Sequence, residues 1–309
     1  MSPDDYAVRL REITKSFGRH RAVDALSLDV PRRSVYGFIG PNGSGKTTTL
    51  RMIMHILLPD SGEVTVLGDP AQRAANDSVG YLPEERGLYK KMSVRRILKY
   101  FAALKGMAAP KASAEIDRWL SRMNLNPWAE KKVETLSKGM SQKLQFIAAV
   151  VSKPKLVILD EPFSGLDPVN LEVLREAILE LRDNGTTVIL STHDMGLAEE
   201  MCDFICMIHK GKKVLDGTLA QIQNRYGADT VRVRLEEGAA LLKEYPDLES
   251  VHDFGQLQEV RLKSEPQKLL RYLTERAAVR HFEVVHPSLH DIFIRIAGND
   301  GEDPGEPDE

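Results

Sequence analysis

The amino-acid sequence predicts an α/β fold built on a buried parallel sheet, and two patterns support that prediction. Residues 35–39 form a short apolar run, which a glycine-rich stretch at residues 40–47 joins to a helix-forming segment. Two further apolar runs, at residues 156–159 and 187–190, each pass directly into polar residues. Continuous apolar runs of this length are typical of strands buried on both faces, and ligands sit at the carboxyl edge of such sheets. We therefore expect a parallel sheet whose rim carries the chemistry.

The glycine-rich stretch has the pattern G-x-x-x-x-G-K-T between a strand and a helix, which is the context of a phosphate-binding loop. Glycines let backbone N–H groups curl around a triphosphate, and the helix N-terminus adds a positive dipole. Lys46 is expected to reach the outer phosphates, and the Thr47 hydroxyl to hold Mg²⁺. A glycine-rich turn without a ligand is the alternative, but it leaves the lysine and the threonine unexplained. The loop predicts a bound nucleotide.

The composition is that of an ordinary globular protein, with 42% hydrophobic and 28% charged residues in 309. No apolar run approaches the roughly 18 residues of a membrane-spanning helix, and the N-terminus has no secretion signal, so we expect a cytoplasmic chain. The formal net charge is −3, and residues 299–309 hold six acids and no base. The remaining chain is too mildly basic to indicate nucleic-acid binding. Residues 298–309 are expected to be a disordered acidic tail.

Periodicity predicts the remaining elements in order. Strands are expected at residues 6–13, 25–30, 63–67 and 79–82. Helices are expected at residues 94–105, 113–123 and 143–151, and another helix begins at Pro168, since proline suits a first helical position. Phe17 stands in a predicted polar turn before the glycine loop. It is either a packing residue or a face on which adenine stacks.

Acids and a histidine stand at the predicted rim of the sheet. Asp160 and Glu161 end one apolar run, and His193 follows the next. Asp160 is expected to hold Mg²⁺ through water, and Glu161 to polarise the attacking water. A strand that merely ends in a polar turn is the alternative for the acids, and a structural role is the alternative for the histidine. Because His193 shares an edge with the acids, we expect it to contact the γ-phosphate.

Together these motifs resemble the nucleotide-binding subunit of ABC transporters, of the ABC-2 exporter type with a C-terminal accessory domain. The resemblance covers residues 6–227. Its motifs stand in family order: the phosphate loop, the glutamine-loop position Glu84, a signature at residues 136–140, the acidic strand at residues 156–161, a D-loop at residues 164–167, and His193. The resemblance implies a P-loop ABC ATPase core with a mixed sheet, an antiparallel β subdomain and a helical subdomain at about residues 88–152.

The resemblance also implies an ATPase that works as a dimer, with two ATP molecules and Mg²⁺ held between two copies of the chain. The residues implied to bind ATP within one copy are Phe17, Val23, Gly40, Pro41, Asn42, Gly43, Ser44, Gly45, Lys46, Thr47 and Thr48. Those implied to reach ATP from the other copy are Ser137, Lys138, Gly139 and Asp167. The implied catalytic residues are Glu161, His193 and Lys46, and the implied metal contacts are Thr47, Asp160 and Glu84. A separate transmembrane permease is the implied partner, which would hold the chain at the inner face of the cell membrane.

Two positions depart from the family pattern. Glu84 stands where glutamine is usual, and the signature reads Leu-Ser-Lys-Gly-Met. A carboxylate at Glu84 can still meet Mg²⁺ or its waters, whereas Lys138 would either approach the γ-phosphate or point into solvent. Neither change removes a group that the chemistry requires, so we expect activity and favour export. The alternative class is a soluble ABC-type ATPase of translation or DNA repair, which usually carries two cassettes or a long coiled-coil insert.

The composition shifts at about residue 229, where a second pattern begins. Strand and helix periods predict the order βαββαβ over residues 231–286, closed by a helix at residues 289–296. This order predicts a small α+β accessory domain of ferredoxin-like type at residues 229–297. A regulatory or dimer-supporting role is expected for it, and ligand sensing is the alternative.

Overall fold

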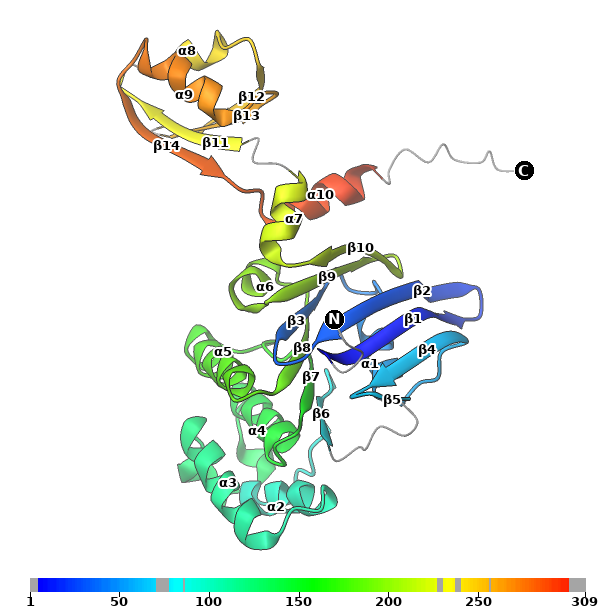
Figure 1. The fold of residues 1–309 in the computed structure, drawn as a ribbon. Helices are drawn as coiled ribbons and strands as arrows, with labels where there is room; N and C mark the ends of the chain where they lie inside the picture. The colour runs from blue at the N-terminus through cyan, green and yellow to red at the C-terminus, as the bar shows by residue number, and fades with distance from the viewer. Residues whose placement is uncertain are drawn as a thin grey trace, which may run out of the picture. The chain divides into compact units, whose positions relative to one another are not determined.

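The computed structural model describes residues 5–70, 78–85, 87–226, 230–236, 240–255 and 257–299. The chain divides into two compact units, Met1–Gly217 and Thr218–Glu309. The domain boundary expected at residues 227–229 and residues 300–309 of the tail expected at 298–309 lie outside the described residues, whereas residues 298 and 299 end a helix. Each unit is built on sheets of its own (Figure 1).

A six-stranded sheet in the order β10-β9-β3-β8-β7-β6 organises the first unit. Its strands are β3 (Val35–Ile39), β6 (Val79–Leu82), β7 (Leu156–Asp160), β8 (Thr187–Thr192), β9 (Phe204–His209) and β10 (Lys212–Gly217). Neighbouring strands are parallel except for β10, which runs antiparallel to β9 at the edge. Every residue of β3, β7 and β8 is buried, as central parallel strands require. The predicted buried parallel sheet is confirmed.

A second, antiparallel sheet in the order β2-β1-β4-β5 completes the β structure of this unit. Its strands are β1 (Tyr6–Phe17), β2 (His20–Pro31), β4 (Ser61–Val66) and β5 (Asp69–Pro70). The first two strands are longer than predicted, because the register between them shifts and Glu12 and Ala25 take positive φ values of 47° and 46°. Bulges of this kind interrupt the two-residue alternation from which a strand is predicted.

The helices described in this unit are α1 (Lys46–Ile53), α2 (Val94–Leu104), α3 (Ala109–Arg122), α4 (Lys138–Val150), α5 (Pro168–Asp183) and α6 (Met195–Met201). Helix α4 begins five residues earlier than the predicted residue 143. Ser137 caps it by accepting a hydrogen bond from the Met140 N–H at 3.2 Å. Helix α3 also begins earlier than the predicted residue 113, since Pro110 fits the first helical turn.

Helices α2, α3 and α4 pack together as an insert between β6 and β7 (Figure 1). Trp119 of α3 packs edge-on against Phe146 of α4, with ring centroids 5.5 Å apart, and both side chains are buried. Arg118 of α3 contacts Glu180 of α5 at 2.8 Å, so a charged contact ties the insert to the helix that follows the D-loop.

The second unit begins with α7 (Leu219–Tyr226) and continues as β11 (Thr230–Leu235), α8 (Ala240–Lys243), β12 (Leu248–Asp253), β13 (Gln258–Leu262), α9 (Pro266–Thr274), β14 (Val279–Val285) and α10 (Leu289–Asn299). Its strands form one antiparallel sheet in the order β12-β13-β11-β14. Strands β11 and β14 therefore pair although two strands and two helices separate them in sequence. The predicted βαββαβ order of a ferredoxin-like domain is confirmed.

A membrane-spanning helix needs a minimum length and hydropathy. In the described ranges of the chain, every helix is too short or too polar to cross a bilayer.

Candidate functional site

The glycine-rich loop runs from the end of β3 into α1 and needs glycine for steric reasons. At Gly40, with φ 148°, a Cβ would lie 2.2 Å from the carbonyl oxygen of Ile208 in β9. At Gly45, with φ 106°, a Cβ would lie 2.3 Å from the carbonyl oxygen of Ala22 in β2. Both distances are far below van der Waals contact, so the loop lies directly against two strands. Its backbone is thereby fixed at the sheet's carboxyl edge.

Lys46 opens α1 with its ammonium group inside the loop. Nζ donates hydrogen bonds to the carbonyl oxygens of Gly40 at 2.7 Å and Pro41 at 3.1 Å, and the residue is only 6% exposed. A carboxylate oxygen of Glu161 lies 4.0 Å from Nζ. Burial lowers the pKa of Lys46 from its ordinary value, and the nearby carboxylates, Glu161 foremost, oppose that shift. The structure thus places a buried cation where the outer phosphates were predicted.

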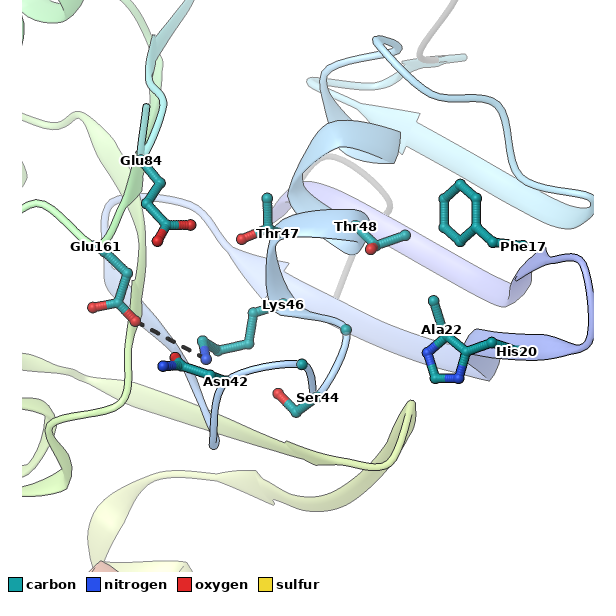
Figure 2. Close-up of a pocket in the computed structure, with 12 residues that line it drawn as sticks. Phe17, His20, Ala22, Asn42, Ser44, Lys46, Thr47, Thr48, Glu84 and Glu161 are labelled. Atoms are coloured by element: carbon teal, nitrogen blue, oxygen red, sulfur yellow. Dashed lines mark ion pairs between the residues drawn. The ribbon is translucent and has the colours of Figure 1, made fainter. Parts of the chain in front are cut away.

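A cavity of about 480 Å³ opens beside this loop (Figure 2). Its lining residues are Phe17, His20, Ala22, Asn42, Gly43, Ser44, Gly45, Lys46, Thr47, Thr48, Glu84 and Glu161. The loop donors lie at one end and Phe17 and His20 lie together at the other, on the β1–β2 hairpin. The cavity thus has a polar end, with Lys46, Glu84 and Glu161, and an aromatic end, with Phe17.

The aromatic end differs from the sequence prediction in two details. Phe17 is the last residue of β1 rather than part of a turn, and it is 52% exposed. Val23, expected to contact ATP, is fully buried, and its neighbour Ala22 lines the cavity instead. Ala22 lies at a register shift between β1 and β2, where Ser16 pairs with Arg21 and Lys15 pairs with Val23, so the alternation of side chains along β2 is interrupted there.

Asp160 ends β7 and is completely buried. Its Oδ1 accepts hydrogen bonds from the Ser191 hydroxyl at 2.5 Å and the Thr47 hydroxyl at 3.3 Å. Its Oδ2 is buried and has no hydrogen-bond partner among the described residues. An unpaired buried carboxylate oxygen is costly, so this atom calls for a partner beyond the described residues.

Glu161 follows in a strained backbone conformation, with φ 49°. Its N–H donates to the backbone oxygen and the hydroxyl of Ser191 at 3.2 and 3.0 Å, which fixes the turn. His193 Nδ1 lies 3.0 and 3.1 Å from the two carboxylate oxygens of Glu161. The structure therefore joins Lys46, Glu161 and His193 in one chain of contacts, as the shared edge of β7 and β8 predicted.

The signature and D-loop residues form a different group. Ser137 and Asp167 cap α4 and α5, and Asp167 accepts from the Asn170 N–H at 3.0 Å. A Cβ on Gly139 would lie 3.4 Å from Leu166 and 3.6 Å from Asn170, so the two segments adjoin. The Lys138 side chain lies over Gly165 and is exposed. None of the four residues predicted to reach ATP from the other copy lines the cavity of this chain.

Three residues near the site were not predicted. His20 and Ala22 line the cavity, and Ser191 bonds both Asp160 and Glu161. The signal for Ser191 was present in the sequence, as it occupies the penultimate position of an apolar strand. For His20 no local signal existed, because its place depends on how the β1–β2 hairpin lies against α1.

Comparisons with known proteins agree with this geometry. The sequence profile described as ABC transporter matches residues 23–164, and the profile described as the C-terminal domain of DrrA1-3-like ATP-binding proteins matches residues 217–297. The ABC transporter ATP-binding protein YhaQ of Bacillus subtilis is 43% identical over 288 residues, covering 93% of this chain and 97% of the relative. The chain belongs to the ATP-binding protein family of ABC transporters.

Further relatives of this ABC ATP-binding protein include the Nod factor export ATP-binding protein I of Rhizobium sp. (strain N33). It is 33% identical over 303 residues, which cover 96% of this chain and 98% of the relative. A solved structure described as the ATP-binding subunit of an ABC transporter shares 28% identity and a TM-score of 0.68, covering 72% of this chain and 93% of the other. The predicted ABC ATPase fold is confirmed.

The function follows at the level of the family. The chain is an ATP-binding and ATP-hydrolysing subunit that energises a membrane transporter. The alternative of a soluble ATPase in translation or DNA repair is not favoured, because the relatives are named as transporter and export proteins.

Proposed function

We propose that two copies of this ABC ATP-binding protein hold two ATP molecules between them. Each copy supplies its phosphate loop to one nucleotide and its signature residues to the other. The observation that supports this arrangement is the separation of two groups in one chain. The cavity contains the loop and Glu161, whereas Ser137, Lys138 and Asp167 are exposed elsewhere. In a two-fold symmetric pair of chains, the phosphate loop of each copy faces the signature residues of the other copy.

Within one copy, each end of the cavity suits a different part of ATP. Phe17 offers its exposed ring for stacking with adenine. The loop N–H groups and the N-terminus of α1 bind the phosphates, and Lys46 neutralises their charge. Ser44 lines the cavity with a buried hydroxyl that has no hydrogen-bond partner among the described residues, so a phosphate oxygen would satisfy it.

The same site fits Mg²⁺. The unpaired Oδ2 of Asp160 and the Thr47 hydroxyl are oxygen donors of the kind that Mg²⁺ prefers, and Glu84 adds a carboxylate to the cavity. Within the described ranges there is no cluster of three or more His, Cys, Asp or Glu side chains that could hold a metal alone. Bound ions at this site would therefore depend on phosphate oxygens and water for the remaining ligands. When bound, Mg²⁺ neutralises charge on the phosphates.

In hydrolysis, Glu161 orients and polarises the attacking water through its carboxylate. His193 holds that carboxylate in place: an Nδ1–H proton is donated to Glu161, and Nε2 is left on the far side of the ring. With 59% of its side chain exposed, His193 can also meet the γ-phosphate or the second copy. Lys46, 4.0 Å from Glu161, stabilises the negative charge that develops on the transferred phosphoryl group.

We further propose that the chain drives export through a separate transmembrane permease, which places it at the inner face of the membrane. Support comes from the relatives named as export ATP-binding proteins, which match this chain from end to end, including the second unit. Fractionation of cells that express the chain with and without a candidate permease would test the partnership. Recovery in the membrane fraction is expected only when the permease is present.

The variant Glu161→Gln tests the catalytic assignment. ATP affinity should be retained, because Lys46 and the loop are unchanged, while turnover should fall about a hundredfold or more. Calorimetry measures binding and phosphate release measures turnover. Glu85→Gln is the matched control, since that carboxylate is 89% exposed and lies outside the cavity; it should hydrolyse ATP normally. Wild-type turnover in Glu161→Gln would remove Glu161 from the mechanism.

A further inference from the structure

The second unit contains a cavity of its own, of about 520 Å³, which is as large as the nucleotide cavity. Its walls come from β11, β12 and β13 on one side and from α10 and the end of β14 on the other. Cavities in this size range hold small molecules. None of the residues that the proposed ATP site uses belongs to this unit.

Strand alternation shows that this cavity is not part of the hydrophobic core. Val231 and Val260 are fully buried and pack with the leucines of α8 and α9, which lie together on one face of the sheet (Figure 1). The adjacent residues Arg232 and Arg261 therefore point to the opposite face, where they line the cavity. The charged face contributes nothing to the core of the unit, so packing does not account for its residues.

The lining is rich in arginine. Three arginines, Arg232, Arg261 and Arg295, line it together with His252 and the hydroxyl residues Thr230 and Ser250. Two carboxylates, those of Glu259 and Asp291, are also present. Oδ2 of Asp291 accepts hydrogen bonds from the N–H and the hydroxyl of Ser288, which turns this charge toward the start of α10. Among the lining residues the arginines outnumber the carboxylates by one, and Arg232 and Arg261 each pair with a glutamate.

Two of the arginines are held in fixed orientations. Nε of Arg232 donates to Glu259 at 3.1 Å, and Nε of Arg261 lies 3.2 Å from a carboxylate oxygen of Glu249. A carboxylate on Nε fixes the plane of the guanidinium group before any ligand arrives, which lowers the entropic cost of binding. Guanidinium groups pair with carboxylates and phosphates through two parallel hydrogen bonds.

We propose that this arginine cavity, defined by Arg232, Arg261 and Arg295, binds a small molecule that carries a carboxylate or phosphate group. The site belongs to the accessory unit and shares no lining residue with the ATP site. The proposal does not depend on the dimer or on the catalytic assignments.

Calorimetric titration of the full chain tests this site. Lys46→Ala is used as the background, because the phosphate loop itself attracts anions. Inorganic phosphate and citrate are titrated separately, and the tighter of the two probes shows whether phosphate or carboxylate is preferred. One probe molecule should bind per chain. Adding Arg232→Gln should weaken that binding about tenfold or more, the usual effect of losing a charge-assisted hydrogen bond.

The matched control is Arg234→Gln. Arg234 lies two residues along β11 on the same face and is exposed, but it does not line the cavity. Its substitution should leave the affinity unchanged. Arg261→Gln lies on a different strand and is a second test that guards against a disturbance of β11 by Arg232→Gln. It should weaken binding to the same extent. Absence of saturable binding for both probes at millimolar concentration, or equal weakening by Arg232→Gln and Arg234→Gln, would overturn the proposal.

Discussion

Gly45 illustrates how a single residue in the phosphate loop meets two separate constraints. Its φ of 106° is one that residues with a Cβ rarely adopt, and the carbonyl oxygen of Ala22 occupies the space that a Cβ would need. Gly43 shares only the first constraint, since its φ is 77° but no atom lies within 4 Å of a built Cβ. Comparing substitutions at Gly43 and Gly45 therefore distinguishes the effect of backbone strain from the effect of steric contact.

Gly45→Ala should lower the free energy of unfolding of the first unit by on the order of 2–4 kcal/mol, whereas Gly43→Ala should lower it by about 1 kcal/mol. Tryptophan fluorescence during urea unfolding measures both, because the two tryptophans of the chain, Trp119 and Trp128, lie in the first unit. Equal losses in the two variants would show that the contact with Ala22 is not the decisive factor.

The positions of site residues were predictable from the sequence where a motif determines them. They were not predictable where contacts between distant segments determine them. Lys46, Asp160 and Glu161 meet as expected, because their positions follow from strand ends that share one edge of a sheet. Ala22 was not predicted to line the cavity, because it lies at a register shift in β2 that the pattern of the sequence does not reveal. Lys138 lies over Gly165 through a contact between segments distant in sequence.

At the scale of elements, α4 shows why boundaries are harder to predict than existence. Serine, glycine and lysine at its start resemble a loop in the sequence, yet the Ser137 side chain caps the helix and adds a turn. The added turn places Gly139 against Leu166, which belongs to the expected D-loop. Signature and D-loop thereby form one surface of the chain.

Helix α3 carries a buried carboxylate, Glu115, that contacts Arg118 at 2.6 Å and Lys153 at 2.9 Å. Burial raises the pKa of Glu115, but the hydrogen bonds from Arg118 and Lys153 outweigh it, so that the pKa lies below its ordinary value. A carboxyl with a lowered pKa in the folded state stabilises the fold above its unfolded pKa. That contribution is lost as the pH falls through the folded value.

Glu115→Gln should therefore destabilise the first unit by on the order of 1–2 kcal/mol at neutral pH, with the difference from wild type shrinking as the pH falls below the ordinary pKa of glutamate. Urea unfolding at a series of pH values provides the measurement. Glu134→Gln serves as the control, since that side chain is 46% exposed and its nearest cation lies 3.5 Å away. A Glu115→Gln deficit that stays constant down to acid pH would contradict the ion-pair explanation.

The whole molecule combines a common ATPase fold with an accessory unit whose order of elements the sequence also revealed. The sequence predicted the short buried strands of the parallel sheet and the βαββαβ order of the second unit, whereas bulges hid the full length of β1 and β2. The assembly of two chains does not follow from the fold of one chain alone. The cavity and the signature surface belong to one chain but do not meet within it, so the account depends on a second copy that supplies what each chain lacks.

The molecular mass of Glu161→Gln in solution, measured by light scattering with and without ATP, tests this dependence most directly. A single chain has a mass of 34.6 kDa, and ATP should raise the observed mass to about twice that value, as expected for a two-fold dimer. Adding Ser137→Arg should keep the mass at that of one chain, because the bulky side chain blocks the signature surface but leaves the phosphate loop intact. A mass of one chain at every protein concentration, with ATP demonstrably bound to Glu161→Gln, would contradict the account.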